Sequence, residues 1–148
     1  MIWFQAMKIT QIINKFKLKV KTTKLKDFTV LNISVNSREN LKNSVFIAVC
    51  GNKLNGHNYV PQAIANGFKA VIFQKNCLLD SYIQQNSGVV FLEADDTRVL
   101  CQELAVFFHN NPSKQLKVIG VTGTNGKTTI TYLIESVLIR GKRRNTVC

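Results

Sequence analysis

A run of β-branched residues that leads into a glycine-containing loop and then a helix is the most constraining feature of this chain. Residues 118–129 read VIGVTGTNGKTT. Gly123 and Gly126 let the backbone turn sharply and approach an anion without a Cβ in the way. A helix that begins at about Lys127 directs its free N–H groups and positive dipole end toward the loop. The pattern predicts a strand over 116–121, a phosphate-binding loop and a helix over 127–140. The helix residues expected to be buried are Ile130, Leu133, Ile134, Val137 and Leu138.

The chemistry of the loop is predicted by its last three residues, Gly126, Lys127 and Thr128. In the pattern G-x-x-x-x-G-K-[ST], the lysine reaches the terminal phosphates of a nucleotide and the hydroxyl binds Mg²⁺. The strict pattern is not met, because Val121 stands where its first glycine belongs, so the loop is a variant. An ordinary strand–turn–helix connection is the alternative interpretation. The flanking strand and helix patterns favour the phosphate-binding loop.

The residues ahead of this loop alternate between strand-like and helix-like patterns, which is typical of an α/β fold. The expected strands are 28–35, 44–50, 69–74 and 88–92, and the expected helices are 7–16, 60–66, 77–86 and one from Asp95 or Asp96 to His109. A natural boundary near 92–96 divides the chain into 1–92 and 93–148. A phosphate-loop domain needs further strands and acidic Mg²⁺ ligands after its first helix. We therefore expect the chain to be the front of a longer protein, or a remnant of one.

The charge of the chain suggests a competing hypothesis. The net charge is +12, and the segment 15–26 reads KFKLKVKTTKLK. A basic nucleic-acid binder would show this charge together with steeply salt-dependent binding. Alternation at a period of two residues also describes a half-solvated strand with its lysines outward, and aromatic residues are not interleaved with them. We predict that nucleic acid is not a partner.

The remaining composition excludes several classes of site. Four cysteines are widely spaced and form no C-x-x-C pair, which is typical of reduced thiols. His57 and His109 have no ligand partners nearby in sequence, so a metal site built on them is not expected. No stretch approaches the roughly 20 apolar residues of a membrane span, and the N-terminus does not resemble a signal peptide. Met7 is an alternative start. A cytoplasmic monomer without membrane contact is expected.

Two segments together resemble the Mur ligases, the ATP-dependent amide-forming enzymes of peptidoglycan precursor synthesis. Residues 36–73 resemble the family's N-terminal UDP-binding domain, whose motif runs D-S-R, an F-x-A strand, G-x-x-x-D-G-H, a helix and A-V-I. Residues 121–129 resemble its ATP loop. The family aspartates are Asn36 and Asn55 here, which puts full substrate affinity in question. Asn43 stands at an expected glycine and can adopt the same left-handed conformation.

The resemblance implies a fold and a set of site residues. It implies a small N-terminal UDP-binding α/β domain followed by the start of a P-loop-containing central domain. Val35 and Ser37 are similar to contacts to the UDP part of the substrate, and Asn52, Lys53 and Leu54 lie in the loop that closes over it. Ser37 read alone also fits a simple turn residue at a strand end. The positions that resemble the ATP loop are Gly123, Thr124, Asn125, Gly126, Lys127, Thr128 and Thr129. Lys127 would take the catalytic role, and Thr128 would bind Mg²⁺.

Within the family, Thr124-Asn125 and residues 107–113 resemble the members that add the third residue of the stem peptide. The implied partners are UDP-N-acetylmuramoyl-L-alanyl-D-glutamate and a diamino acid, either diaminopimelate or lysine. The implied reaction uses ATP to activate the D-glutamate side-chain carboxylate, which the amine then attacks. The family's carbamoylated lysine and further metal ligands would lie beyond Cys148, so we expect these residues alone to be inactive. A remnant that binds a UDP-sugar or ATP without turnover is the alternative.

Overall fold

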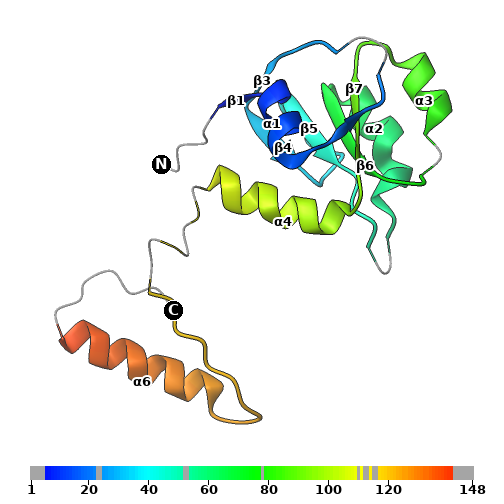
Figure 1. Cartoon of the computed structure of the whole chain (residues 1–148). Helices are drawn as coiled ribbons and strands as arrows, with labels where there is room; N and C mark the ends of the chain where they lie inside the picture. Colours follow the sequence, from blue (N-terminus) through cyan, green and yellow to red (C-terminus); the bar gives the residue numbers. More distant parts are fainter. Residues whose placement is uncertain are drawn as a thin grey trace. The chain divides into compact units, whose positions relative to one another are not determined.

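The chain forms two compact units, residues 1–112 and 113–148 (Figure 1). The computed structural model describes residues 6–22, 25–51, 54–77, 79–109, 111, 114 and 117–141. Within these ranges no helix is long and apolar enough to span a membrane.

A five-stranded sheet forms the centre of the first unit. Its strand order is β2–β7–β6–β5–β4. The strands are β2 (Lys19–Val20), β4 (Asn32–Ser34), β5 (Ser44–Ile47), β6 (Ala70–Gln74) and β7 (Val90–Ala94). β4 to β7 are mutually parallel and neighbours in chain order, whereas β2 pairs antiparallel with β7. The carboxyl ends of four successive strands therefore meet at one edge, which is where open α/β sheets usually bind ligands.

Helices cover both faces of this sheet, as the α/β prediction requires (Figure 1). α1 (Ile9–Phe16) and α4 (Thr97–Phe108) pack on one face, and α2 (Val60–Ala65) and α3 (Asp80–Gln85) pack on the other. Alternate strand residues enter the two cores, because neighbouring side chains of a strand point to opposite faces. In β5, Val45 and Ile47 contact the α1/α4 side and Phe46 contacts the α2/α3 side.

Local sequence signals explain where several of these elements begin and end. Asp96 caps α4 by accepting hydrogen bonds from the N–H groups of Arg98 (2.7 Å) and Val99 (3.1 Å), as predicted for Asp95 or Asp96. Gly67 follows α2 with a φ of +89°, a conformation that suits glycine at a helix end. A 3₁₀ turn, η1 (Gly56–Tyr59), precedes α2 and is capped by the Asn55 side chain.

The N-terminal third differs from the prediction. The expected strand 28–35 is divided into β3 (Thr29–Val30), which pairs with β1 (Met7–Lys8), and β4. The expected helix 7–16 accordingly begins at Ile9. The basic segment 15–26 is not one strand: α1 continues through Phe16, Lys17 reverses the chain with a φ of 52°, and only Lys19 and Val20 pair with β7.

Two expectations for the second unit were wrong. Residues 117–121 form no strand, because the described residues of this unit include no other strand to complete the backbone hydrogen bonds. Val118 and Ile119 are 73% and 59% exposed. The helix was predicted correctly as α6 (Lys127–Arg140), but none of its residues is buried. An amphipathic pattern predicts which face a helix can bury, but burial requires a partner surface.

The division into compact units lies elsewhere than the predicted domain boundary near 92–96, which stays a prediction. Leu100, Leu104 and Phe108 of α4 belong to the core formed with α1 and the sheet. α4 is therefore part of the first unit, and the structural division comes after Pro112 rather than after Leu92.

Candidate functional site

The first candidate site is the loop that precedes α6. Gly126 is the N-cap of α6 and has a left-handed φ of 75°, and Gly123 has a φ of 153°. Both are values that residues with a Cβ rarely adopt. A Cβ on Gly126 would meet no atom within 4 Å, so its backbone conformation is what favours glycine there. These two glycines give the loop the shape that the sequence predicted.

The lysine of this loop is folded over the loop backbone. Lys127 Nζ donates hydrogen bonds to the carbonyl oxygens of Gly123 (2.6 Å) and Thr124 (3.2 Å). The ammonium group is thus held within the loop, four and three residues from its acceptors. Because these acceptors are neutral and the lysine is exposed, anionic oxygens can replace them at little cost.

The amino end of α6 is open to an anion. Gly126 has no side chain to cap the helix, and the first turn contains no acidic residue. The Gly126 carbonyl accepts the first helical hydrogen bond, from Ile130 N–H at 2.9 Å. The N–H groups of the first turn therefore lack helical partners, as at any helix start, and attract negative charge. Thr128 is exposed in this turn, so its hydroxyl is accessible to a cation bound to phosphates.

A metal site beyond that hydroxyl is not formed by the described part of the chain. Among those residues, no three His, Cys, Asp or Glu side chains are grouped to hold a metal ion. Mg²⁺ commonly binds through one or two protein oxygens together with substrate phosphates and waters. Thr128 fits that limited role.

The second candidate site lies at the carboxyl ends of β4 and β5. Val35 follows β4 and is 57% exposed, and Leu54, in the loop after β5, is 66% exposed. A cavity of about 280 Å³ adjoins Val35, between the ends of β4 and β5 and the apolar side of α4. The other two residues predicted for this loop, Asn52 and Lys53, lie outside the described residues.

Ser37, the second residue expected to contact UDP, is buried and hydrogen-bonded within the protein. It is 6% exposed, and its Oγ donates a 2.7 Å hydrogen bond to Gln62 Oε1 on α2. Its carbonyl accepts from Asn66 Nδ2, also at 2.7 Å. The hydroxyl proton is thus used inside the protein, and the oxygen lone pairs remain to accept a hydrogen bond from a ligand. Gln62 and Asn66 belong to the expected helix 60–66, but no sequence pattern indicated that they hold this turn.

Asn36, which stands at the family's aspartate position, shapes the same turn. Its backbone N–H donates to Ser34 Oγ (2.9 Å), and its side-chain Oδ1 accepts from Arg38 N–H (3.1 Å). An amide oxygen makes this contact as a carboxylate would, because only an acceptor is needed. The turn geometry therefore tolerates asparagine at this position.

Comparison with known proteins identifies a family that matches most of the chain. The family model described as "Mur ligase family, catalytic domain" matches residues 29–122, which include the β4 and β5 ends and the start of the loop before α6. This chain belongs to the Mur ligase family. The match therefore covers the strand ends of the second candidate site, and it stops at Thr122, just before residues 123–129 of the first.

Relatives of this Mur ligase chain have consistent names. UDP-N-acetylmuramyl-tripeptide synthetase 2 of Oceanobacillus iheyensis is 36% identical over 132 residues, which is 89% of this chain and 26% of the relative. The UDP-N-acetylmuramoyl-L-alanyl-D-glutamate–2,6-diaminopimelate ligase of Alkaliphilus metalliredigens is 40% identical over 114 residues, 76% of this chain and 22% of the relative. The chain therefore spans about a quarter of the length of the relatives it matches.

Solved structures show the same fold. MurF from Acinetobacter baumannii aligns with a TM-score of 0.65 and 25% sequence identity, over 93% of this chain and 28% of that protein. The α/β architecture with a mainly parallel sheet is therefore that of Mur ligases.

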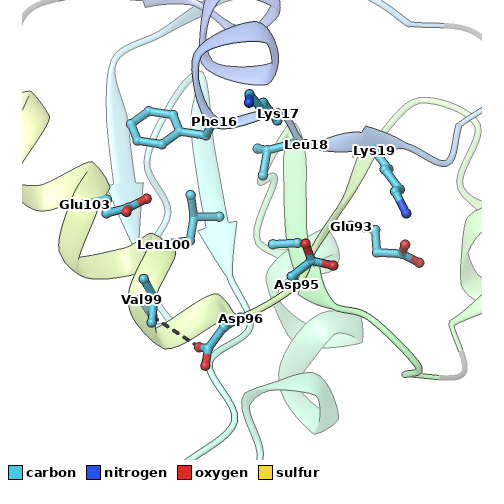
Figure 2. Close-up of a pocket in the computed structure, with 11 residues that line it drawn as sticks. Phe16, Lys17, Leu18, Lys19, Glu93, Asp95, Asp96, Val99, Leu100 and Glu103 are labelled. Carbon is cyan, nitrogen blue, oxygen red and sulfur yellow. Dashed lines mark hydrogen bonds between the residues drawn. The ribbon is translucent and has the colours of Figure 1, made fainter.

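One further pocket of this Mur ligase chain is separate from both candidate sites. It has a volume of about 330 Å³ and lies between the turn after α1 and the turn from β7 into α4 (Figure 2). Lys17 and Lys19 line it together with the carboxylates of Glu93, Asp95 and Asp96. None of the predicted site residues lines this pocket, and Asp96 is already engaged in capping α4.

Proposed function

We propose that this Mur ligase chain is the substrate- and ATP-binding front portion of a cytoplasmic ligase that adds the third residue to UDP-N-acetylmuramoyl-L-alanyl-D-glutamate. The observation that carries the proposal is the loop before α6, in which left-handed Gly126, the uncapped helix start and Lys127 together form a cradle for phosphate. The names of the relatives supply the substrate class. The chain's own residues leave the added diamino acid, diaminopimelate or lysine, undecided.

ATP would be held by residues 123–129. Lys127 Nζ would exchange the carbonyls of Gly123 and Thr124 for phosphate oxygens, and the first-turn N–H groups would donate to the same anion. Thr128 Oγ1 would contribute one ligand to Mg²⁺. When bound, ATP with Mg²⁺ supplies the phosphoryl group that activates a carboxylate for amide formation. Lys127 then acts by offsetting negative charge near that phosphoryl group.

The UDP part of the second substrate would be held at the carboxyl ends of β4 and β5. Val35 offers an exposed apolar surface, and the Ser37 oxygen offers an acceptor whose position is fixed by Gln62. Leu54, with Asn52 and Lys53, would close over the nucleotide. In domain terms, we propose that residues 1–92 bind the UDP-muramoyl peptide and that 93–148 begin the ATP-binding domain, although α4 packs with the first unit.

We further propose that these 148 residues bind both nucleotides without joining the substrates. The described residues offer a phosphate cradle but no grouped metal ligands and no identified site for the incoming amine. The alternative is a non-catalytic module that binds only one nucleotide. Binding of ATP without UDP-sugar binding, or the reverse, would favour that alternative.

Calorimetric titration of the purified chain tests the proposal. ATP with Mg²⁺ and UDP-N-acetylmuramoyl-L-alanyl-D-glutamate should both bind, and Lys127→Ala should weaken ATP binding by at least about tenfold because charge-assisted hydrogen bonds are lost. Arg140→Ala is the matched control, since it removes one positive charge from the far end of the same helix. Equal losses of ATP affinity in the two variants would mean that ATP binding depends only on net charge. Formation of ADP and tripeptide by the chain alone would refute its inactivity.

A further inference from the structure

His57 is buried between the loop after β5 and the end of β6, and it hydrogen-bonds to both. The residue is 7% exposed. Its Nδ1 lies 2.6 Å from Asn55 Oδ1, and its Nε2 lies 3.0 Å from the backbone nitrogen of Gln74, the last residue of β6. A single ring thus bridges two neighbouring strand ends.

These contacts fix the protonation of the ring. A backbone N–H can only donate, so Nε2 must accept the hydrogen bond from Gln74 and cannot carry a proton. Nδ1 therefore carries the proton and donates it to Asn55 Oδ1. The imidazole is neutral, in keeping with burial, which lowers the pKa of His57 below its usual value.

On the loop side, His57 is hydrogen-bonded to the base of the loop after β5, which is closed like the base of a hairpin. Cys50 and Asn55 form an antiparallel bridge, and Gly51 N–H donates to the Leu54 carbonyl at 2.9 Å. Asn55 Oδ1 also accepts from His57 N–H at 3.1 Å. Gly56 N–H donates to the Val49 carbonyl at 2.9 Å. These bonds tie Cys50, Gly51 and residues 54–57 together into one base, which carries Leu54, a residue predicted to close over UDP.

On the sheet side, the network continues into α4. Gln74 Oε1 accepts from Thr97 Oγ1 at 3.3 Å, and Arg98 Nε donates to the Cys50 carbonyl at 2.5 Å. The fully buried Thr97 is the first residue of α4. The loop base, the end of β6 and the start of α4 are thus linked by hydrogen bonds, with the His57 ring at the junction.

We propose that His57 is a positioning residue for the substrate loop: its neutral ring ties the base of segment 50–57 to the end of β6 and so sets where Leu54 and its neighbours meet the nucleotide. The link to β6 follows from the contacts themselves, whereas the consequence for UDP rests on the proposed function. Neither the proposed ATP loop nor the contacts of Ser37 involve His57.

Two substitutions separate the two hydrogen bonds of the ring. His57→Leu removes both while keeping an apolar group of similar size, and His57→Gln keeps an acceptor near the position of Nε2 for Gln74 N–H. Gln85→Leu is the matched control, because it removes a polar side chain from an exposed position of α3 in the same unit. Circular dichroism melts establish that each variant is folded before it is compared.

The first measurement is amide hydrogen exchange, which needs no ligand. His57→Leu should speed exchange at Gly56 and Gln74 by about tenfold, the effect of losing one buried hydrogen bond. His57→Gln should partly restore the slow exchange of the Gln74 amide. Gln85→Leu should change exchange at neither Gly56 nor Gln74. Unchanged exchange in His57→Leu would overturn the proposal. If that variant does not fold, the ¹⁵N shifts of the wild-type ring decide: a proton on Nδ1 is expected, and a proton on Nε2 at neutral pH would overturn it.

The second measurement is UDP affinity by calorimetry. His57→Leu should weaken UDP binding by about tenfold, with ATP affinity unchanged. Faster exchange with unchanged UDP affinity would show that the ring holds the loop but that the loop does not position the nucleotide, which overturns the proposal. If the wild type did not bind UDP, the proposed function would be refuted instead. Amide hydrogen exchange at Gly56 and Gln74 would still test the link between the loop base and β6.

Discussion

The two units of this chain reach ordered local geometry by different routes. The first unit buries two hydrophobic cores, one on each face of its sheet. In the second unit α6 has no buried residue, yet the loop before it has the glycine conformations of a phosphate-binding loop. The geometry of the loop before α6 is therefore encoded almost entirely by local sequence, whereas the geometry at the strand ends depends on contacts between distant segments.

The sequence separations of the contacts show this difference directly. Lys127 bonds to carbonyls four and three residues away. Ser37 bonds to Gln62, 25 residues away, and His57 bonds to Gln74, 17 residues away. A mutation in the second unit should therefore act locally, and a mutation in the first unit should spread through the core.

The largest expected effect is on core packing. Phe46 is 1% exposed and packs edge-to-face on Phe68, with ring centroids 5.6 Å apart. Phe46→Ala should lower the free energy of unfolding by about 3–5 kcal/mol. Leu133→Ala on α6, where the side chain is 60% exposed, should change it by no more than about 0.5 kcal/mol. Urea unfolding followed by circular dichroism measures both. Comparable losses would mean that the two units are equally dependent on packing.

The next largest effect is expected at Gly56, in the loop base of the first unit. A Cβ there would lie 2.7 Å from both the nitrogen and the oxygen of Val49, so the backbone must shift. Gly56→Ala should destabilise the protein by about 1–3 kcal/mol. Gly88→Ala is the control, because no atom lies within 4 Å of a Cβ at that position. Thermal melts compare the two, and an equal melting temperature for both variants would contradict the steric argument.

A smaller and local effect is expected at Gly126. Its left-handed φ of 75° should make Gly126→Ala cost about 1–2 kcal/mol locally. Gly126→Asn should cost less, because asparagine tolerates this conformation. The readout is exchange of Ile130 N–H, which donates to the Gly126 carbonyl, with the melting transition of the first unit unchanged. If Gly126→Ala lowered the melting temperature of the first unit, the effect would not be local, and the contrast between the two units would fail.

The smallest effect is a pH dependence that arises from His57. Burial lowers its pKa from the ordinary value of 6.5, so the unfolded chain takes up a proton at a higher pH than the folded chain does. The free energy of unfolding should therefore fall as the pH drops below about 6.5, until the folded-state pKa is passed. Among the described side chains that line the adjacent cavity there is no Asp or Glu to oppose this shift and no Lys or Arg to add to it.

Comparison with His57→Gln isolates the contribution of His57 protonation to the free energy of unfolding, because glutamine does not titrate. The wild type should lose melting temperature relative to the variant between pH 7.5 and pH 5, while all other titrating groups are shared. A difference in melting temperature that stays constant over this range would contradict the prediction.

The sequence predicted much of the fold because most of its signals are local. Apolar runs located β5, β6 and β7, Asp96 located the start of α4, and the glycine pattern located the phosphate loop. The strand over 116–121 and the buried face of α6 were wrong, because both depend on partners that a one-dimensional pattern does not reveal. The split of 28–35 into β3 and β4 depends likewise on pairing with β1 and β5.

The candidate site was predicted unevenly for the same reason. Lys127 and the glycines could be located from spacing alone. The contact of His57 with Gln74 was missed, since nothing in the sequence places the end of β6 beside the loop after β5. His57 lies between the expected strand 44–50 and the expected helix 60–66, in a segment of mostly polar residues and glycines that does not indicate a buried side chain. The roles of Val35, Ser37 and Leu54 remain predictions.

The short strand β2 has a consequence for self-association. It covers the outer edge of β7, where Val20 pairs with Leu92, Lys21 N–H donates to the Phe91 carbonyl at 2.9 Å and Lys21 Nζ lies 3.0 Å from Glu93. Without β2, the apolar β7 would present an unpaired backbone to any neighbouring strand, and such edges template aggregation. The lysines of β2 and the residue after it make the replacement edge charged and short. A short, charged edge of this kind disfavours pairing with a strand of another copy of the chain.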